Sequence, residues 1–567
     1  MRELPKVMIK RMKKGGREGM TRVAPMLLLL GLLQGSIFTG CSEEDLGLAV
    51  NVYFPCNQYN RTAGISPFTD VSYVEVCLNY SQADLDPNCA ISTLSSGEVE
   101  FPDIRLGKPL RVGVEGRATQ ARGTPLAYGQ TAPVVADDSQ LQDLDLMVSL
   151  VDRFGTATDR PSCQGLSCKC SQMRTPRIDF TATVLHDGRV LIAGGRDDSN
   201  VILDSAEILD PKDGTFRYVA SRLNFARAGH SAVRLGSQYG YRVLLLGGES
   251  EDQQWRIAEY YDPKTNGFYK MDSPMFSARV NFTATRLNDG RVLLAGGMKG
   301  QSPAEEFLAT MEIYNPARDA FQEVTGVLNE GREHHTATVT TVGRPDSQIL
   351  IAGGKKNQVA LSSANVVEIE EGSTSATVTE LTMPGGGRWG HDAAKVGPGD
   401  QVLIVGGSNN DQGGGVGVLS SMELFFGHSG NPRFVTWTDL NRPELCVGRW
   451  GLTVTPIEAP SGTGLTTRAL LVVGGLDAAI NSVAQAEVLI PDDPEDPTGF
   501  SVDCTAERVI RDSRYGHRAV KLPSGKVIAV GGIYRYQPDG DLEVLNTGEI
   551  YEPGPTYWCG NKNCADW

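Results

Sequence analysis

The sequence predicts an all-β protein in which most of the chain consists of seven copies of one structural unit. Three observations support this prediction. An apolar run that ends in two glycines recurs seven times at spacings of 49 to 68 residues, an arginine precedes each run, and a glutamate follows each run. The composition is that of an ordinary globular protein, with 40% hydrophobic and 21% charged residues in 567. Such periodicity indicates a repeat architecture.

Residues 1–40 are predicted to be a targeting segment that is not part of the fold. A basic stretch precedes the apolar run APMLLLLGLLQGSIF, and the small residues after that run lead directly to Cys41. This arrangement resembles the lipobox of bacterial lipoproteins, which implies cleavage before Cys41 and acylation of that cysteine. The apolar run of about fifteen residues is shorter than the ~20 needed to span a bilayer. The alternative is an ordinary secretory signal in which the cysteine has no role.

Residues 41–152 contain short stretches with period-two alternation, separated by turn signals. They predict a small antiparallel β-sandwich. This domain holds three cysteines, Cys56, Cys77 and Cys89, so one of them is free or pairs outside the domain.

A cysteine-rich connector is expected over residues 153–176, and a short tail over residues 559–567. If Cys41 is acylated, ten cysteines remain, and an even number in an exported chain indicates disulfides. Zinc at Cys163, Cys168 and Cys170 is the competing interpretation, but the sequence has no CxxC pair and no nearby histidine.

The seven double glycines mark strands that are expected to be buried on both faces. Paired glycines also let the backbone turn at φ values that other residues resist. The seven pairs are Gly194-Gly195, Gly247-Gly248, Gly296-Gly297, Gly353-Gly354, Gly406-Gly407, Gly474-Gly475 and Gly531-Gly532.

Two charged columns keep register with the glycines. The arginines, which open each first strand, are Arg177, Arg227, Arg279, Arg332, Arg388, Arg449 and Arg514. The glutamates, which lie in each third strand, are Glu207, Glu259, Glu312, Glu368, Glu423, Glu487 and Glu549. Seven matched positions are hard to explain as seven active sites. We therefore predict that they are structural, and that each arginine meets a third-strand glutamate in a partly buried pair.

These columns resemble the kelch repeat, in particular the bacterial form R-x-x-H-x-A-T, then D-G-R-V-L-x-A-G-G, then E-x-Y-D-P. The resemblance covers residues 177–558 and implies a seven-bladed kelch β-propeller, preceded here by the small antiparallel β-sandwich. Repeat four lacks the Asp-Pro turn, and repeat five carries a glycine-rich insert. Ring closure stays open, because either the connector or the tail could supply the fourth strand of the last blade.

Histidines fall into the same register. His230, His335, His391 and His517 each lie three residues after a column arginine, where the kelch pattern expects a histidine. We expect them to pack inside the blades and not to bind metal. His334 and His335 are adjacent, and adjacent residues on a strand point to opposite faces.

Several functions are disfavoured by the sequence. A formal charge of -15 opposes binding to nucleic acid. We find no nucleophile elbow, phosphate loop or His-Glu-x-x-His helix. Galactose oxidase has a similar propeller, but it also has a C-terminal domain that supplies a copper ligand and that has no counterpart here. We therefore expect no catalytic residue, no cofactor and no metal. A carbohydrate-active or copper-dependent enzyme of the envelope is the alternative.

A binding surface is the remaining prediction. In the last three repeats an aromatic residue follows the column arginine, and further aromatic residues occur in loops of the same expected face. The candidate residues are Trp255, Trp389, Trp450, Tyr515, Tyr534 and Tyr536. Packing between blades is the competing interpretation. The sequence thus predicts an exported, membrane-anchored lipoprotein whose propeller binds an envelope protein or a carbohydrate.

Overall fold

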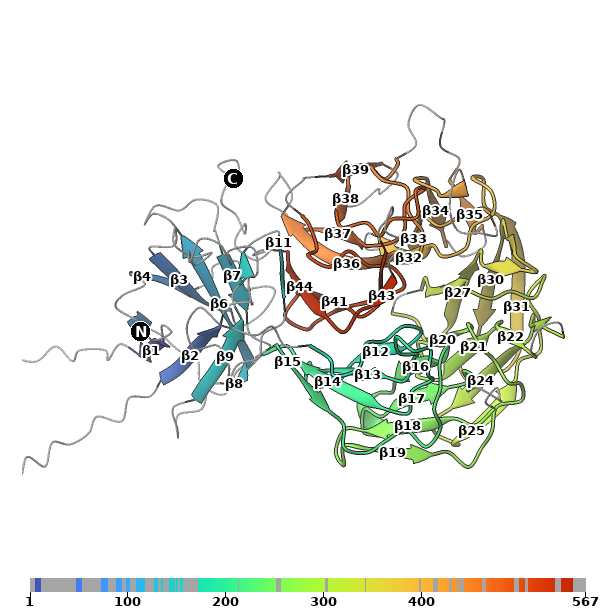
Figure 1. Ribbon diagram of the computed structural model, residues 1–567, viewed down its shortest axis with the longest axis horizontal. Coiled ribbons are helices and arrows are strands. Elements are labelled where there is room, and N and C mark those ends of the chain that lie inside the picture. Colours follow the sequence, from blue (N-terminus) through green and yellow to red (C-terminus); the bar gives the residue numbers. More distant parts are fainter. Residues whose placement is uncertain are drawn as a thin grey trace, which may run out of the picture.

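The computed structural model is all-β and contains seven four-stranded sheets arranged as blades in a ring (Figure 1). It confirms the predicted fold class and the number of blades. The described residues run from 172 to 553, except for 213, 251–255, 301–303, 342, 397–398, 411–416, 428–430, 436, 438–442, 461–465, 494–498, 505–507 and 536–541. Before residue 172 the structure describes strands β1 to β11.

Each of the first six blades is a simple antiparallel meander. Blade one consists of β12 (Thr181–Val184), β13 (Val190–Ala193), β14 (Ala206–Asp210) and β15 (Thr215–Tyr218); blade two of β16 (Ser231–Arg234), β17 (Val243–Leu246), β18 (Glu259–Asp262) and β19 (Gly267–Lys270); blade three of β20 (Thr283–Arg286), β21 (Val292–Ala295), β24 (Met311–Asn315) and β25 (Ala320–Glu323). Blade four consists of β26 (Thr336–Val339), β27 (Ser347–Ala352), β30 (Ser363–Ile369) and β31 (Ala376–Thr382); blade five of β32 (Asp392–Val396), β33 (Gln401–Val405), β34 (Met422–Phe426) and β35 (Arg433–Phe434); blade six of β36 (Thr453–Pro460), β37 (Thr466–Val473), β38 (Glu487–Pro491) and β39 (Phe500–Asp503).

The seventh blade is built from two distant parts of the chain. Its inner three strands are β40 (Arg518–Lys521), β41 (Val527–Val530) and β44 (Gly548–Glu552), and its outer strand is β11 (Arg153–Thr156). Strand β11 pairs antiparallel with β44, with Arg153 opposite Glu552. The strand that closes the ring therefore comes from the start of the segment that we expected to be a connector.

The first strands of successive blades are neighbours all the way around the ring, and β40 returns to β12. The double glycines explain how the blades meet. Both glycines of each pair have positive φ, and the amide of the second donates to the carbonyl of the next blade's column arginine at 2.8–3.0 Å. A Cβ on Gly194 would lie 2.5 Å from the carbonyl oxygen of Arg227, so no larger residue fits.

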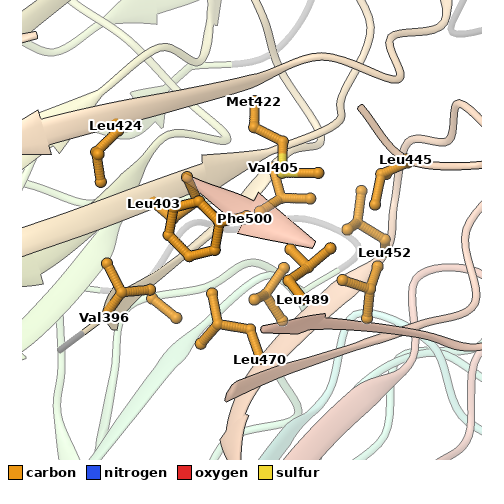
Figure 2. Close-up of a cluster of buried hydrophobic side chains, with 13 residues drawn as sticks. Val396, Leu403, Val405, Met422, Leu424, Leu445, Leu452, Leu470, Leu489 and Phe500 are labelled. Carbon is orange, nitrogen blue, oxygen red and sulfur yellow. The ribbon is translucent and has the colours of Figure 1, made fainter. Parts of the chain in front are cut away.

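Apolar side chains fill the space between blades. The second strands are almost entirely buried, as the continuous apolar runs predicted. Figure 2 shows one such cluster, in which Leu403 and Val405 of β33 pack with Leu470 of β37 and Phe500 of β39. Blades five and six are therefore held together by hydrophobic burial across their faces.

Two sheets precede the propeller. One contains β5 (Glu98–Phe101), β1 (Lys6–Arg11), β2 (Gly47–Tyr53) and β9 (Gln142–Met147), and the other contains β10 (Ser149–Leu150), β7 (Ala127–Gln130), β6 (Pro109–Arg117), β3 (Tyr73–Asn79) and β4 (Asn88–Thr93), with β8 (Val134–Val135) also paired to β6. The second sheet is antiparallel as predicted. The first sheet is not, because β1 pairs with β5 and β2 pairs with β9 in parallel.

One detail of this region bears on cleavage before Cys41, and another concerns its cysteines. Strand β1 lies within residues 1–40, so cleavage before Cys41 would remove it and leave β2 and β5 without the strand between them. In the other sheet, the register places Cys77 directly opposite Cys89. Cys41 itself, Cys56, and the cysteines at 163, 168, 170, 559 and 564 lie outside the described residues. None of the described helices is long and apolar enough to cross a membrane.

Candidate functional site

The column arginines form the framework of every blade. Arg177 shows the arrangement: its Nη1 donates to the carbonyl oxygens of Gly194 and Ser205, both at 2.9 Å. All seven arginine side chains are fully buried, and each donates to the carbonyl of the first glycine in its own blade. The guanidinium thereby joins the start of the first strand to the end of the second.

Six of the arginines also form a buried ion pair with a third-strand glutamate. These pairs are Arg177–Glu207, Arg227–Glu259, Arg279–Glu312, Arg388–Glu423, Arg449–Glu487 and Arg514–Glu549. The carboxylates are bound by the backbone as well. Glu312, for example, accepts from the amides of Phe276 and Ser277 at 2.7 and 3.0 Å. Glu207, Glu259, Glu312, Glu487 and Glu549 each hold the segment that leads into their own blade in this way.

Blade four departs from this pattern, and the expected pairing of Arg332 with Glu368 is wrong. The residue in register is Asn365, whose Oδ1 lies 3.2 Å from Arg332 Nη2, whereas Glu368 is exposed. Arg332 also donates to Asn329 Oδ1 at 2.8 Å, and its nearest described carboxylate, on Glu330, is 3.9 Å away. Burial lowers the pKa of Arg332 to about 10.

The column histidines connect adjacent blades. The Nε2 atoms of His230, His335, His391 and His517 lie 2.8–3.1 Å from the hydroxyl of a threonine on the first strand of the preceding blade. Burial lowers the pKa of all four, to about 3 for His391, so they are neutral near neutral pH. Each imidazole thus already uses its Nε2 in a contact within the protein.

We use the term axial ring for the two residues that follow each column arginine, because they lie where the first strands converge. The ring consists of Ile178-Asp179, Ala228-Gly229, Val280-Asn281, Glu333-His334, Trp389-Gly390, Trp450-Gly451 and Tyr515-Gly516. The first residue of each pair forms a β-bridge with the residue after the double glycine. Backbone geometry is therefore the same in every blade, while the side chains differ.

Blades five to seven supply an aromatic half of the ring. The Trp389 and Trp450 ring centroids are 4.9 Å apart, and those of Trp450 and Tyr515 are 5.8 Å apart. Trp389 is only 8% exposed, its Nε1 donates to Asn410 O at 2.7 Å, and Lys355 Nζ lies over its ring. Trp389 is therefore an interior residue, while Trp450 and Tyr515 are partly buried and reach the surface.

The other predicted surface residues are divided between described and undescribed parts of the chain. Tyr534 is partly buried in a hairpin formed by β42 (Ile533–Arg535) and β43 (Leu542–Val544), which follows the last double glycine. Trp255 and Tyr536 lie outside the described residues. The structure thus brings Trp389, Trp450 and Tyr515 together.

A polar half of the ring was missed by the sequence reasoning. Glu333 Oε2 accepts from Asn281 Nδ2 at 3.0 Å, and the Glu333 carboxylate lies 3.7 Å from both Lys355 Nζ and His334 Nε2. Asp179 lies 3.9 Å from Arg196 Nε. A signal was present, because a charged residue follows the arginine only in repeat four.

Two charged residues stand just inside the ring, at the first positions of β32 and β40. Asp392 Oδ2 accepts from the amide of Val454 at 2.7 Å, and Arg518 Nε donates to Phe180 O at 3.0 Å. Burial raises the pKa of Asp392 to about 6, against the opposing effects of the bonds from the amides of Val454 and Ala393 and of the charge on Arg518. Four other blades carry threonine at this position.

Two further places could hold a ligand. The sulfurs of Cys446 and Cys504 lie within 4.8 Å of a Glu487 carboxylate oxygen, but the two cysteines form a disulfide and Glu487 is paired with Arg449. A polar hollow of about 380 Å³ lies between blades four and five, where Glu368 accepts from Gln348 Nε2 at 2.9 Å. Neither was predicted as a site.

The comparison with protein families agrees with the fold. The family model of the kelch motif matches residues 180–222, which span the first blade. A solved structure entitled "Structure of YjhT" is 15% identical, covers 59% of this chain and 99% of its own, and has a TM-score of 0.41. No curated protein matches the sequence. The chain thus carries a kelch motif in a seven-bladed propeller.

Proposed function

We propose that this propeller is the binding part of an exported lipoprotein, that a lipid on Cys41 holds it at a membrane, and that the axial ring binds a partner in the cell envelope without catalysis. The observation that carries this proposal is the contrast between the framework and the ring. Backbone contacts repeat in all seven blades, whereas the ring side chains are aromatic in three blades and polar in others.

The framework supports a binding role because its reactive groups are already engaged. The column arginines bond to six column glutamates and to backbone carbonyls of their own blades, and the four column histidines contact threonines of the preceding blades. Selectivity must then come from residues that break the repeat. Surface aromatic groups beside paired charges are typical of interaction sites.

The alternative function is a carbohydrate-active or galactose-oxidase-like copper enzyme. A copper site of that kind needs histidine ligands. Four of the described histidines use Nε2 in threonine contacts, and His186 stacks on Tyr241 with ring centroids 4.8 Å apart. These contacts favour the binding function. Stoichiometric copper in the purified protein would favour the enzyme instead.

Lipidation is tested on the full chain in a bacterial host. We expect metabolic labelling with palmitate and membrane fractionation to show a labelled, membrane-bound protein, and Cys41→Ser to lose both properties. The intact mass identifies the first residue of the mature protein. A soluble, unlabelled protein that retains residues 1–40, and with them β1, would contradict this part of the proposal.

Binding is tested by affinity capture from envelope extract with the acylated protein. Trp450→Ala and Tyr515→Ala remove the partly exposed aromatic groups of the ring, and Tyr269→Ala removes an exposed aromatic group on the outer strand of blade two. We expect capture to depend on Trp450 and Tyr515 and not on Tyr269. Equal capture by all three variants would place the partner elsewhere.

A further inference from the structure

The second position of the axial ring has a left-handed backbone in every blade. Glycine occupies it in blades two, five, six and seven, with φ between 62° and 67°. Asp179, Asn281 and His334 occupy it in blades one, three and four, with φ of 54°, 55° and 53°. One backbone conformation is thus built with glycine four times and with a side chain three times.

The fold needs only the backbone at this position. In blades two, three, four, six and seven, the amide of this residue donates to the carbonyl of the equivalent residue in the preceding blade. Examples are the bonds from Asn281 to Gly229 at 3.0 Å, from His334 to Asn281 at 3.1 Å and from Gly516 to Gly451 at 2.9 Å. The left-handed conformation costs a residue with a Cβ more than it costs glycine. Blades three and four therefore retain a side chain at a position where glycine makes the same bond without this cost, and blade one also carries a side chain there.

These three side chains face the polar half of the ring. Asn281 Nδ2 donates to Glu333, and His334 Nε2 lies 3.7 Å from the same carboxylate. The Asp179 side chain is 53% exposed and that of His334 is 39% exposed. In its neutral form the imidazole of His334 offers one donor and one acceptor.

The ring carries opposite charges in neighbouring positions. Asp179 is next to Arg196, and Arg196 Nη2 lies 2.7 Å from Glu249 Oε1. Glu333 is next to Lys355. Such an arrangement disfavours a highly charged ligand. It leaves carboxylate, amide and imidazole groups on the same axial ring as the aromatic residues, where the ring centroids of His334 and Trp389 lie 6.1 Å apart. Hydrogen-bonding groups together with an apolar aromatic face complement a ligand whose own ring has hydroxyls at its edge and C–H groups on its face.

We propose that Asp179, Asn281 and His334 contact the ligand, and that this ligand is a neutral saccharide. This inference rests on the proposed binding function and names the class of its ligand. The side chains at these positions are then retained for recognition, and the strain is offset by binding and not by folding.

The test replaces the three residues with glycine, which is the residue found at this position in the other four blades. Saturation-transfer NMR with glucose, galactose, N-acetylglucosamine and a trimer of N-acetylglucosamine measures binding to the wild type, to Asp179→Gly, Asn281→Gly and His334→Gly, and to the triple variant. Asn357→Gly is the control, because Asn357 is an exposed left-handed residue between β28 (Lys355–Lys356) and β29 (Val359–Ala360), outside the ring.

We expect the glycine variants to keep the wild-type melting temperature within a few degrees, and the triple variant to lose saccharide affinity by at least about tenfold. The control should bind as the wild type does. Unchanged affinity in the triple variant overturns the inference, and so does the absence of wild-type binding to all four sugars at about 10 mM. If Trp450-dependent capture of an envelope protein persists in that case, the binding function stands and the saccharide assignment fails. If neither occurs, both fail.

Discussion

The backbone amide of Gly532 donates a 3.0 Å hydrogen bond to the carbonyl of Arg177, and this contact joins the last blade to the first. The same bond links Gly195 to Arg227 between blades one and two. Arg177 in turn holds Gly194 and Glu207 of its own blade. The charged and glycine columns thus form one circular network, in which each arginine side chain serves its own blade and each arginine carbonyl serves the preceding blade.

Strand β11 is expected to contribute more to stability than another outer strand does. Proline at both Phe154 and Gly155 removes at least one ladder bond to β44, because alternate residues donate to the neighbouring strand. In thermal unfolding, the β11 variant should have a lower midpoint than a matched variant with Arg433→Pro and Phe434→Pro in β35. Strand β35 does not close the ring. Equal midpoints would show that closure by β11 is dispensable.

The glutamates of blades four and five are expected to differ in importance. Glu423→Gln leaves the buried Arg388 without its carboxylate and should cost about 3–5 kcal/mol in the free energy of unfolding. Glu368→Gln should cost less than about 1 kcal/mol, because Glu368 is exposed. Urea denaturation measures both values, and a large effect at Glu368 would contradict the corrected register.

Trp389 and Trp450 should separate stability from binding. Trp389→Ala empties an interior position and should cost about 3–5 kcal/mol. Trp389→Phe keeps most of the packing and should recover a large part of that loss. Trp450→Ala should destabilise less and should reduce partner capture. Chemical denaturation together with capture distinguishes the two roles, and a stable Trp389→Ala variant would argue against interior packing.

Acid is expected to destabilise the propeller through its buried histidines. Their folded pKa lies below the unfolded value of about 6.5, so the unfolded state binds more protons and stability falls as pH drops below that value. Asp392 acts in the opposite sense. Its folded pKa of about 6 exceeds the ordinary 3.8, so its contribution is favourable below about pH 4 and is lost as pH rises to about 6.

Asp392→Asn isolates that opposing contribution. We expect the variant to be more stable than the wild type at pH 7.5 and to lose stability more steeply between pH 6 and pH 4. Denaturation curves recorded across this range test both expectations. Parallel curves for the two proteins would mean that Asp392 does not titrate in this interval.

The disulfide between Cys446 and Cys504 encloses a whole blade. These residues are 58 positions apart, before β36 and after β39. Chain entropy predicts that Cys446→Ser with Cys504→Ser costs about 4 kcal/mol. Unfolding of the variant and of the reduced wild type should agree, and a change below about 1 kcal/mol would show that the blade is ordered without the bridge.

The framework could be predicted from sequence because it repeats, and the register error at Glu368 has a specific cause. The other column glutamates lie 12 to 18 residues after the first glycine, and Glu368 lies 15 after Gly353, within that range. Loop length therefore hid the fact that Asn365 holds the structural position. A search for glutamate could not identify an amide in its place.

The candidate site was less predictable because it depends on what breaks the repeat. The aromatic half was visible as Trp389, Trp450 and Tyr515, but their sequence positions could not show that Trp389 is interior. The contacts of Asp179 with Arg196 and of Glu333 with Lys355 form only through β-bridges between the ring and the segments that follow the double glycines. Closure by β11 was equally inaccessible, since the connector and the tail both offered a possible strand.

The two-part origin of blade seven also constrains biosynthesis. Residues 153–156 leave the ribosome well before their partner, residues 548–552, is made. A nascent chain can form its first blades as it emerges, but it cannot complete the toroid before β44 has been made. Truncated products would expose an unpaired strand edge, which marks them for degradation or aggregation.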